Sequence, residues 1–220
     1  MGAAHIVVGF GLRTDVLQRS LAPLTRTISE RPRILIGHHE GVKSMAENLE
    51  EPTFTLIQAY DDFEVRAYEP TIQARVKTAD RGSSGAASGG FRRVASYIFG
   101  GNHSNSTIAM TAPVSIWEEQ EQGWLAFTMP SAYSMERLPR PHDTGVVLVE
   151  CGHETVAVLS FSGLTSPRKV ARLETALRTA VAREGLEATG SVVLAIYENP
   201  WTTLPFRRRN ELHLRIIRPQ

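Results

Sequence analysis

The sequence predicts an α+β fold, in which a distorted, mostly antiparallel β-barrel or sheet is flanked by two helices. Two observations lead to this class. Short runs with the period of a β-strand alternate with two segments whose apolar residues recur at helical spacing. Apart from the first run, at residues 54–60, each predicted helix has two predicted strands before it and two after it, so the second half of the chain repeats the order of the first. This repeat predicts an internal pseudo-two-fold duplication, with both helices packed on one curved sheet.

Apolar-rich or alternating runs predict the strands of the first half, at residues 54–60, 63–68, 71–78, 112–118 and 124–129. The third run alternates most clearly, with Ile72, Ala74 and Val76 on one face and polar or charged side chains on the other. A tract of Gly, Ser and Ala at residues 82–90 predicts a loop that leads into the first helix.

The first helix is predicted to follow this loop and to end before a glycine pair. Its apolar residues recur at helical spacing and are expected to face the sheet: Phe91, Val94, Ala95 and Ile98. We expect Gly100 and Gly101 to end the helix with positive φ angles. Three further side chains are expected to lie on another side of the helix, away from the sheet: Arg92, Ser96 and Tyr97.

The strands of the second half are predicted at residues 145–151, 155–161, 192–197 and 211–217. Ser166 is a favourable N-cap for the second helix, and Pro167 suits its first position. Apolar residues at helical spacing make the face that is expected to cover the sheet: Val170, Leu173, Leu177 and Val181. Gly185 is expected to end this helix.

The composition predicts a folded protein with no strong attraction for nucleic acid or a membrane. The chain has 220 residues, 42% of them hydrophobic, and a formal net charge of +1. This balance gives no overall field for a polyanion, and no run approaches the roughly 18 apolar residues of a membrane-spanning helix. The single cysteine, Cys151, excludes an internal disulfide and a cysteine-rich metal site, and it fits a reducing compartment. We therefore expect a cytoplasmic protein without nucleic acid or membrane partners.

Residues 1–51 do not share the pattern of the rest of the chain. Pro23 and Pro32 interrupt a weak helical periodicity, and the pattern does not resume clearly before Phe54. We expect this part to be a poorly ordered or loosely docked N-terminal extension. Residues 52–220 are expected to form the folded domain.

Several short motifs follow one another from about residue 52 to the C-terminus. They are FEVRAY (63–68), YIFGGN (97–102), IAMTAPV (108–114), FTMP (127–130), LPRP (138–141), FSG (161–163), YENPWT (197–202) and PFRRRNE (205–211). In this order and spacing they give a chain that resembles the SOUL/haem-binding protein family. The resemblance implies a distorted barrel flanked by two helices, in agreement with the duplication. It also implies a non-enzymatic protein that binds haem or another porphyrin without a covalent bond.

The resemblance further implies that the tetrapyrrole lies in a surface groove beside the first helix. A porphyrin needs an apolar bed and cations near its propionates. The residues expected to line the groove are Arg92, Ser96 and Tyr97 on the helix, and Tyr197, Trp201, Arg207 and Arg208 on the loop that begins at residue 197. Two points leave alternatives open. An arginine on a helix suits a solvated surface equally well, and Leu204 stands where family members often carry a lysine.

No residue is assigned as an axial ligand of the iron. His103 follows the glycine pair and Tyr97 is the alternative, but binding by apolar packing without a protein ligand also fits the family. The other histidines after the extension look like isolated surface or strand residues: His142, His153 and His213. Beside the last strand, Asn210 and Glu211 are expected to bond to loop backbone.

The motifs of common enzyme classes are absent from the sequence. There is no G-x-S-x-G nucleophile elbow, no phosphate-binding loop and no zinc-spaced set of His and Cys. We therefore expect a binding protein, and two alternatives remain. One is a regulatory module for non-porphyrin amphiphiles. The other is a hydrolase of the gyrase-inhibitor-like superfamily that would use a buried glutamate, the candidates being Glu64, Glu69, Glu150 and Glu211.

Overall fold

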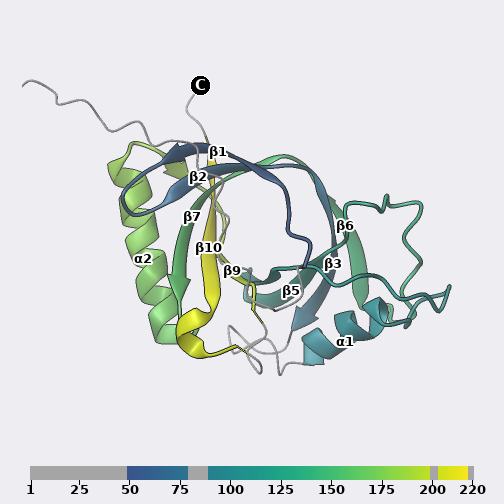
Figure 1. Cartoon of the computed structure of the whole chain (residues 1–220). Coiled ribbons are helices and arrows are strands. Elements are labelled where there is room, and N and C mark those ends of the chain that lie inside the picture. The colour runs from purple at the N-terminus through teal and green to yellow at the C-terminus, as the bar shows by residue number, and fades with distance from the viewer. Residues whose placement is uncertain (1–48, 79–88, 199–202, 218–220) are drawn as a thin grey trace, which may run out of the picture. The chain divides into compact units, whose positions relative to one another are not determined.

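A computed structural model gives the structure of the chain and describes residues 49–78, 89–198 and 203–217 (Figure 1). These residues form one curled antiparallel sheet, a half-barrel, with two helices on its outside. The predicted α+β class is therefore confirmed. None of the described helices is long and apolar enough to cross a membrane.

The sheet consists of β1 (Phe54–Ala59), β2 (Glu64–Tyr68), β3 (Thr71–Thr78), β4 (Val114–Glu119), β5 (Gln122–Thr128), β6 (Val146–Cys151), β7 (Glu154–Ser162), β8 (Glu187–Ala188), β9 (Val193–Ile196) and β10 (Arg209–Ile217). Its order is β1-β2-β7-β10-β9-β4-β5-β3-β6, with β8 paired to β10, and every pair is antiparallel. Each predicted strand is present, and the short β8 is an addition.

The order of the strands confirms the internal duplication. Beyond the edge strand β1, the sheet reads β2-β7-β10-β9-β4-β5-β3-β6. Exchanging each strand of the first half with its counterpart in the second half (β2 with β6, β3 with β7, β4 with β9, β5 with β10) gives the same order read backwards. The pseudo-two-fold axis therefore passes between β9 and β4, and the first strand of each half pairs with the other half.

The helices α1 (Gly89–Ile98) and α2 (Pro167–Arg183) each cover the outer face of one side of the sheet. α1 packs on β3, β5 and β6, where Val94 and Phe127 belong to one buried cluster. α2 packs on β7, β8 and β10, where Leu177 and Leu212 belong to another. Figure 1 shows α2 outside β7 and β10, and α1 outside the lower end of the wall formed by β3 and β6. The core is thus duplicated together with the strands.

The ends of α2 lie where the sequence predicts them. Ser166 has the extended backbone of an N-cap, although its side chain makes no capping hydrogen bond, and Pro167 is the first helical residue. At the other end, Gly185 has a φ angle of +71°, and the N–H of Leu186 donates to the carbonyl of Val181 at 3.1 Å. This arrangement is a Schellman motif, which satisfies carbonyl groups that the helix leaves open.

The glycine pair after α1 has two different functions. Gly100 has the predicted positive φ angle, +104°, which a side chain would disfavour. The same prediction for Gly101 is wrong, because its backbone does not adopt this conformation. Gly101 is needed for close packing instead: a Cβ atom there would lie 2.7 Å from both the carbonyl oxygen and the Oγ of Ser96.

Replacing Gly101 with alanine is therefore expected to lower the free energy of unfolding by about 1–3 kcal/mol, the usual cost of overpacking. Gly89, in the first turn of α1, is the matched control, since a Cβ there meets nothing within 4 Å. Gly89→Ala should be neutral or stabilising by up to about 1 kcal/mol. Urea unfolding of both variants tests the assignment, and equal stability of the two would contradict it.

The inner, concave face of the sheet is polar. Side chains of strand β10 point alternately to its two faces. Leu212 and Leu214 are buried under α2. The residues between and beside them point to the inner face: Glu211, His213 and Arg215. On β3 the predicted alternation is confirmed, because Ile72, Ala74 and Val76 pack in the core under α1 and Thr71, Gln73 and Arg75 line the inner cavity. Polar side chains of several strands therefore meet inside the half-barrel.

The two residues Glu50 and Glu51, which precede β1, contact the rest of the domain. The carbonyl of Glu50 accepts a hydrogen bond from the N–H of Ala112 (2.9 Å), and Glu51 forms an ion pair with Arg209. Residues 1–48 lie outside the described residues, so the extension and the predicted start of the domain near residue 52 stay predictions. Limited proteolysis is expected to remove about the first fifty residues and to leave a resistant core. A first cut between residues 145 and 217 would contradict this domain boundary.

Candidate functional site

A cavity of about 340 Å³ opens on the concave face of the sheet. Strands from both halves of the domain line it, and its aromatic and basic members include Tyr68, Arg75, Trp117, Tyr197 and His213. A second hollow, of about 720 Å³, shares Thr71, Thr128 and Cys151 with it and continues toward residues 129–135. The inside of the half-barrel thus offers the space of a small-molecule site.

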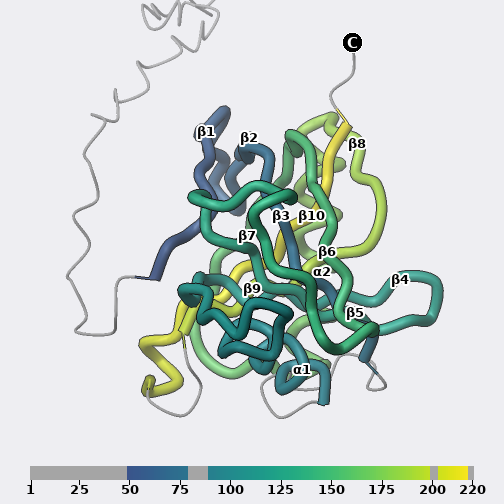
Figure 2. The backbone as a smooth tube through the Cα atoms, turned by 90° about the vertical axis from the view of Figure 1, so that its right-hand side faces the viewer, coloured from purple at the N-terminus to yellow at the C-terminus, as the bar shows by residue number. Residues whose placement is uncertain are grey.

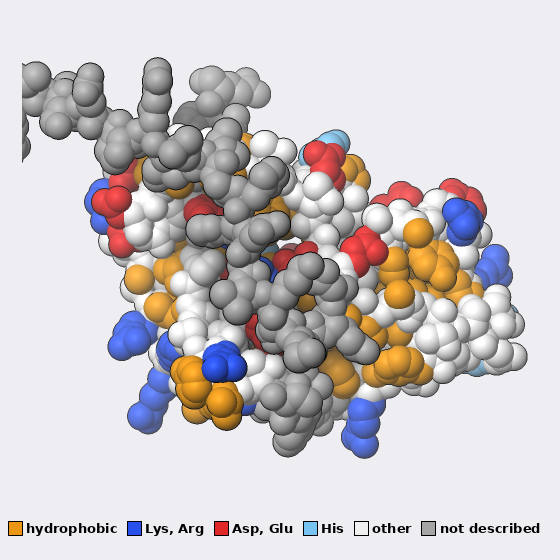
Figure 3. All heavy atoms as spheres, viewed as in Figure 1, with side chains coloured by type: hydrophobic (Ala, Val, Ile, Leu, Met, Phe, Trp, Pro, Cys, Tyr) orange, Lys and Arg blue, Asp and Glu red, His pale blue; other side chains and the backbone are white. Residues whose placement is uncertain are grey.

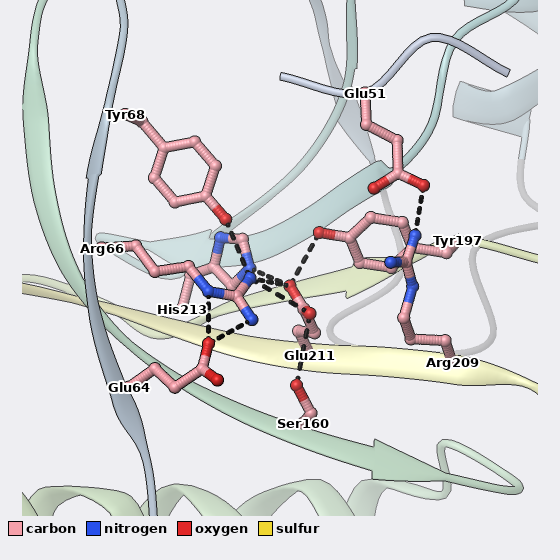
Figure 4. Close-up of polar contacts among 9 residues, drawn as sticks. All are labelled: Glu51, Glu64, Arg66, Tyr68, Ser160, Tyr197, Arg209, Glu211 and His213. Atoms are coloured by element: carbon pink, nitrogen blue, oxygen red, sulfur yellow. Dashed lines mark hydrogen bonds and ion pairs between the residues drawn. The ribbon is translucent and has the colours of Figure 1, made fainter. Parts of the chain in front are cut away.

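Glu211 is the centre of a polar cluster on one wall of this cavity (Figure 4). Its side chain is only 3% exposed, and both carboxylate oxygens accept hydrogen bonds. Arg66 Nη1 donates at 3.2 Å, Ser160 Oγ at 3.2 Å and the Tyr197 hydroxyl at 2.7 Å. His213 Nε2 lies 2.8 Å from Glu211 Oε2. These partners come from β2, β7, the end of β9, and β10, so the cluster ties four neighbouring strands together.

Arg66 balances the charge of this cluster. Its guanidinium also pairs with Glu64 at 2.7 Å, donates to the Tyr68 hydroxyl at 3.3 Å and lies 4.4 Å from the ring centre of Phe54. Both Arg66 and Glu211 are buried. A buried ion pair of this kind is stable only while each member keeps its partners.

The surroundings fix the protonation states in the cluster. Burial by itself would raise the pKa of Glu211, but the hydrogen bond and charge of His213, the charge of Arg66 and the Tyr197 hydroxyl lower it to about 2. Burial, together with the negative charge of Glu211, raises the pKa of Tyr197 far above its ordinary value. At neutral pH the cluster therefore holds a carboxylate and a neutral phenol. Because the carboxylate is saturated with donors and strongly acidic, it is poorly suited to act as a general base.

The expectation for Asn210 is confirmed, and that for Glu211 is wrong. Asn210 Nδ2 donates to the carbonyl of Gly163 at 3.1 Å, as expected for a residue that holds a loop. Glu211 bonds to side chains and not to loop backbone. The sequence did carry a signal, because Glu211 and His213 alternate with leucines along β10, which places charge on one inner face. Its partner Arg66 lies 145 residues away, so the pairing itself needs the sheet register.

On α1, two of the three predicted side chains face outward. Arg92 and Ser96 are exposed, whereas Tyr97 is 1% exposed and belongs to the core. The expectation that Tyr97 points away from the sheet is therefore wrong. Its hydroxyl donates to the carbonyl of Pro139 at 2.9 Å, and burial raises its pKa to about 12. One residue after the helix, Phe99 is 61% exposed.

The predicted loop residues do not form one wall with α1. Tyr197 points into the cavity and bonds to Glu211, and Trp201 lies outside the described residues. Arg207 is exposed and is the last residue of the short helix η2 (Pro205–Arg207), and Arg208 Nε donates to the carbonyl of Thr203 at 2.8 Å. Figures 1 and 2 place η2 and α1 at the same, lower end of the sheet but apart in both views.

This lower end combines apolar and basic surface. Leu204 and Phe206, beside and within η2, are 56% and 68% exposed. Figure 3, seen from the same side as Figure 1, shows Lys and Arg side chains toward the lower edge, with apolar atoms beside them. Such an edge suits a ligand that is apolar in the middle and anionic at its rim.

The structure also pairs two histidines that look unrelated in the sequence. The rings of His103 and His142 lie 5.1 Å apart, next to the glycine pair that ends α1. The expectation that His142 is isolated is therefore wrong. His213 is likewise part of the Glu211 cluster and not isolated. Among the described residues, no three His, Cys, Asp or Glu side chains lie close enough together to hold a metal ion.

Comparison with known proteins places the chain in a family. The family model of the SOUL heme-binding protein matches residues 49–215. Heme-binding protein 2 of Mus musculus is 28% identical over 201 residues, which cover 85% of this chain and 95% of the mouse protein. Heme-binding protein 2 of Homo sapiens is 32% identical over 116 residues, or 49% of this chain and 55% of the human protein.

A solved structure of a hydrolase from Listeria innocua has a similar fold, with a TM-score of 0.54 over 73% of this chain and 94% of that one. Its sequence is 12% identical, so this similarity concerns the fold alone. The family model covers most of the described domain, including both helices and the Glu211 cluster. The chain belongs to the SOUL heme-binding protein family.

Proposed function

We propose that this protein binds haem or a related tetrapyrrole, without a covalent bond, in a groove at the outer face of α1, and that it acts as a carrier, buffer or sensor of this ligand. Membership of the SOUL family supports a tetrapyrrole as the ligand. The observation that carries the location is a stripe on α1: Arg92, Ser96 and Phe99 follow one another at helical spacing and are all exposed.

The stripe has the chemistry that a porphyrin rim requires. Arg92 forms no ion pair with a described carboxylate, so its guanidinium is available to a propionate. Ser96 adds a hydroxyl, and Phe99 adds a flat apolar surface. A charge-assisted bond between Arg92 and a propionate would contribute roughly 1.5–3 kcal/mol when shielded from water. Tyr97 would support this surface from below by anchoring α1 to Pro139.

The second side of the groove is proposed to come from the loop around η2. Arg207 and Arg208 would supply further cations, with Leu204 and Phe206 as apolar surface. Trp201 remains a predicted contributor. Tyr197 remains a predicted site residue as well, but its bond to Glu211 gives it an indirect role, because it connects the start of this loop to the inner cluster.

Titration of the purified protein with hemin tests the proposal. We expect a saturable shift of the Soret band with about one site per chain. An ester panel run on the same sample separates binding from the hydrolase alternative, for which Glu211 is poorly suited because Arg66, Ser160 and Tyr197 occupy its oxygens. Turnover that is lost in a Glu→Gln variant, without a Soret shift, would contradict the proposal. The cytoplasmic location and the absence of nucleic acid or membrane partners stay predictions.

A further inference from the structure

The described residues place four arginines on the concave face, and three of them pair with carboxylates. Arg209 stacks on Tyr197 and pairs with Glu51. Arg66 pairs with Glu64 and Glu211, and Arg215 pairs with Glu154. Arg75, on β3, forms no ion pair with any carboxylate of the described residues, although it lies in the wall of the 340 Å³ cavity. A half-buried guanidinium without a counter-ion is costly to desolvate and therefore attracts an anion.

The contacts of Arg75 position its guanidinium without neutralising it. Nε donates to Gln73 Oε1 at 2.9 Å, and Nη2 lies 3.0 Å from the Sγ of Cys151. The guanidinium carbon is 5.3 Å from the ring centre of Trp117. None of these three partners is a carboxylate: Gln73 offers an amide, Cys151 a sulfur atom and Trp117 an indole ring. They take two of the five N–H donors of an arginine, which leaves donors for a ligand.

Small side chains lie next to Arg75 on the floor of the cavity. In the register of the sheet, Arg75 is opposite Ala126 on β5, and Ala126 is opposite Ser115 on β4. The methyl group of Ala126 fills little space beside the guanidinium. The neighbouring pair, Gln73 opposite Thr128, adds an amide and a hydroxyl to the same wall. The result is a row of neutral donors around one positive charge.

The other walls are formed by aromatic and apolar side chains together with three carboxylates, two of which have basic partners. Trp117, Tyr68, Val156 and Val193 line the cavity beside this row. Of its carboxylates, Glu154 pairs with Arg215, Glu69 lies 3.5 Å from His153, and Glu119 is exposed at the end of β4. The walls therefore suit a flat apolar ring that carries one anionic group.

We infer that this cavity is a second ligand site, separate from the α1 stripe, for a small aromatic carboxylate whose anionic group binds Arg75. The cavity volume is at the lower end of the range for small-molecule sites, which fits one or two fused rings. The ring would lie against Trp117 and Tyr68, and Ser115 would donate a hydrogen bond to the carboxylate.

Calorimetric titration with 2-naphthoate and its neutral isostere 2-naphthamide tests this inference. The two compounds share shape and differ in charge. We expect 2-naphthoate to bind at least about tenfold more tightly, since a shielded charge-assisted bond is worth a factor of roughly ten to a hundred. Arg75→Gln should abolish this preference. Ser115→Val, which keeps Arg75 and its partners, should weaken 2-naphthoate by about two- to tenfold.

Arg92→Ala is the matched control, because it removes an arginine from the α1 stripe and should leave 2-naphthoate binding unchanged. Hemin affinity should in turn be unchanged in Arg75→Gln. Equal affinity for the two naphthalene compounds, no binding of either at millimolar concentration, or unchanged 2-naphthoate binding in a folded Arg75→Gln protein would overturn the inference. Loss of hemin binding in Arg75→Gln would also overturn it, by placing the tetrapyrrole inside the half-barrel. If hemin bound none of the proteins, the proposed function would be contradicted, and the inference about the cavity would be unaffected.

Discussion

Replacing Glu211 with alanine is expected to lower the free energy of unfolding by about 3–5 kcal/mol, the cost of breaking a buried ion pair from one side. The variant leaves Arg66 buried with only the partly exposed Glu64 to balance it. It also removes the acceptor of the Tyr197 hydroxyl and of Ser160 Oγ. Because these groups lie on four neighbouring strands, the loss should appear as lower global stability in urea unfolding.

Two control variants test whether the loss of stability comes from breaking the buried ion pair and not from shortening any side chain on these strands. Glu64→Ala removes the other carboxylate of Arg66, which is 41% exposed, and should cost about 1 kcal/mol or less. The double variant Arg66→Met/Glu211→Leu removes both buried charges and should recover much of the loss. If Glu64→Ala and Glu211→Ala were equally destabilising, the buried pair would not be the stabilising element.

The same cluster predicts how stability depends on pH. The pKa of Glu211 is lowered from 4.5 to about 2 in the folded protein. A carboxylate with a lowered pKa stabilises the fold fully above its unfolded pKa and loses this contribution as the pH falls through the folded pKa. The difference corresponds to about 3 kcal/mol. The decline of stability between about pH 5 and about pH 2 should therefore be smaller in Glu211→Gln than in the unchanged protein. Parallel pH profiles would contradict this assignment.

The fold was predictable from local patterns because they agree with one another. Period-two alternation identified β3, and the repeated order of strands around each helix gave the duplication that the reversed strand order confirms. Local patterns do not show which way a side chain points when it has both an apolar ring and a polar group. Tyr97 was expected on the side of the helix away from the sheet, but its ring fills the core and its hydroxyl donates to the carbonyl of Pro139.

The candidate site likewise has a part that the sequence predicts and a part that only the folded chain shows. The outward position of Arg92 and Ser96 follows from the helical period alone. The Glu211 cluster and the pairing of His103 with His142 depend on residues far apart in the chain, so they need the strand register and the path of the loops. A row of alternating charges on β2 and β10 is the sequence signal that predicts such a cluster, though not its partners.

The second large effect concerns the tetrapyrrole itself. Arg92→Ala is expected to raise the dissociation constant of hemin about tenfold to a hundredfold, because a charge-assisted bond of roughly 1.5–3 kcal/mol to a propionate is lost. Folding should be nearly unaffected, within about 0.5 kcal/mol, since Arg92 is exposed and pairs with no described carboxylate. Arg172→Ala is the matched control: it removes an exposed arginine from α2, on the other half of the domain.

Soret titration of the unchanged protein, Arg92→Ala and Arg172→Ala with hemin tests the central claim most directly, which is that the tetrapyrrole binds at the outer face of α1. The predicted result is one saturable site in all three proteins, with weaker affinity in Arg92→Ala and unchanged affinity in Arg172→Ala. Equal hemin affinity in Arg92→Ala and the unchanged protein, or the same loss in both variants, would contradict the claim.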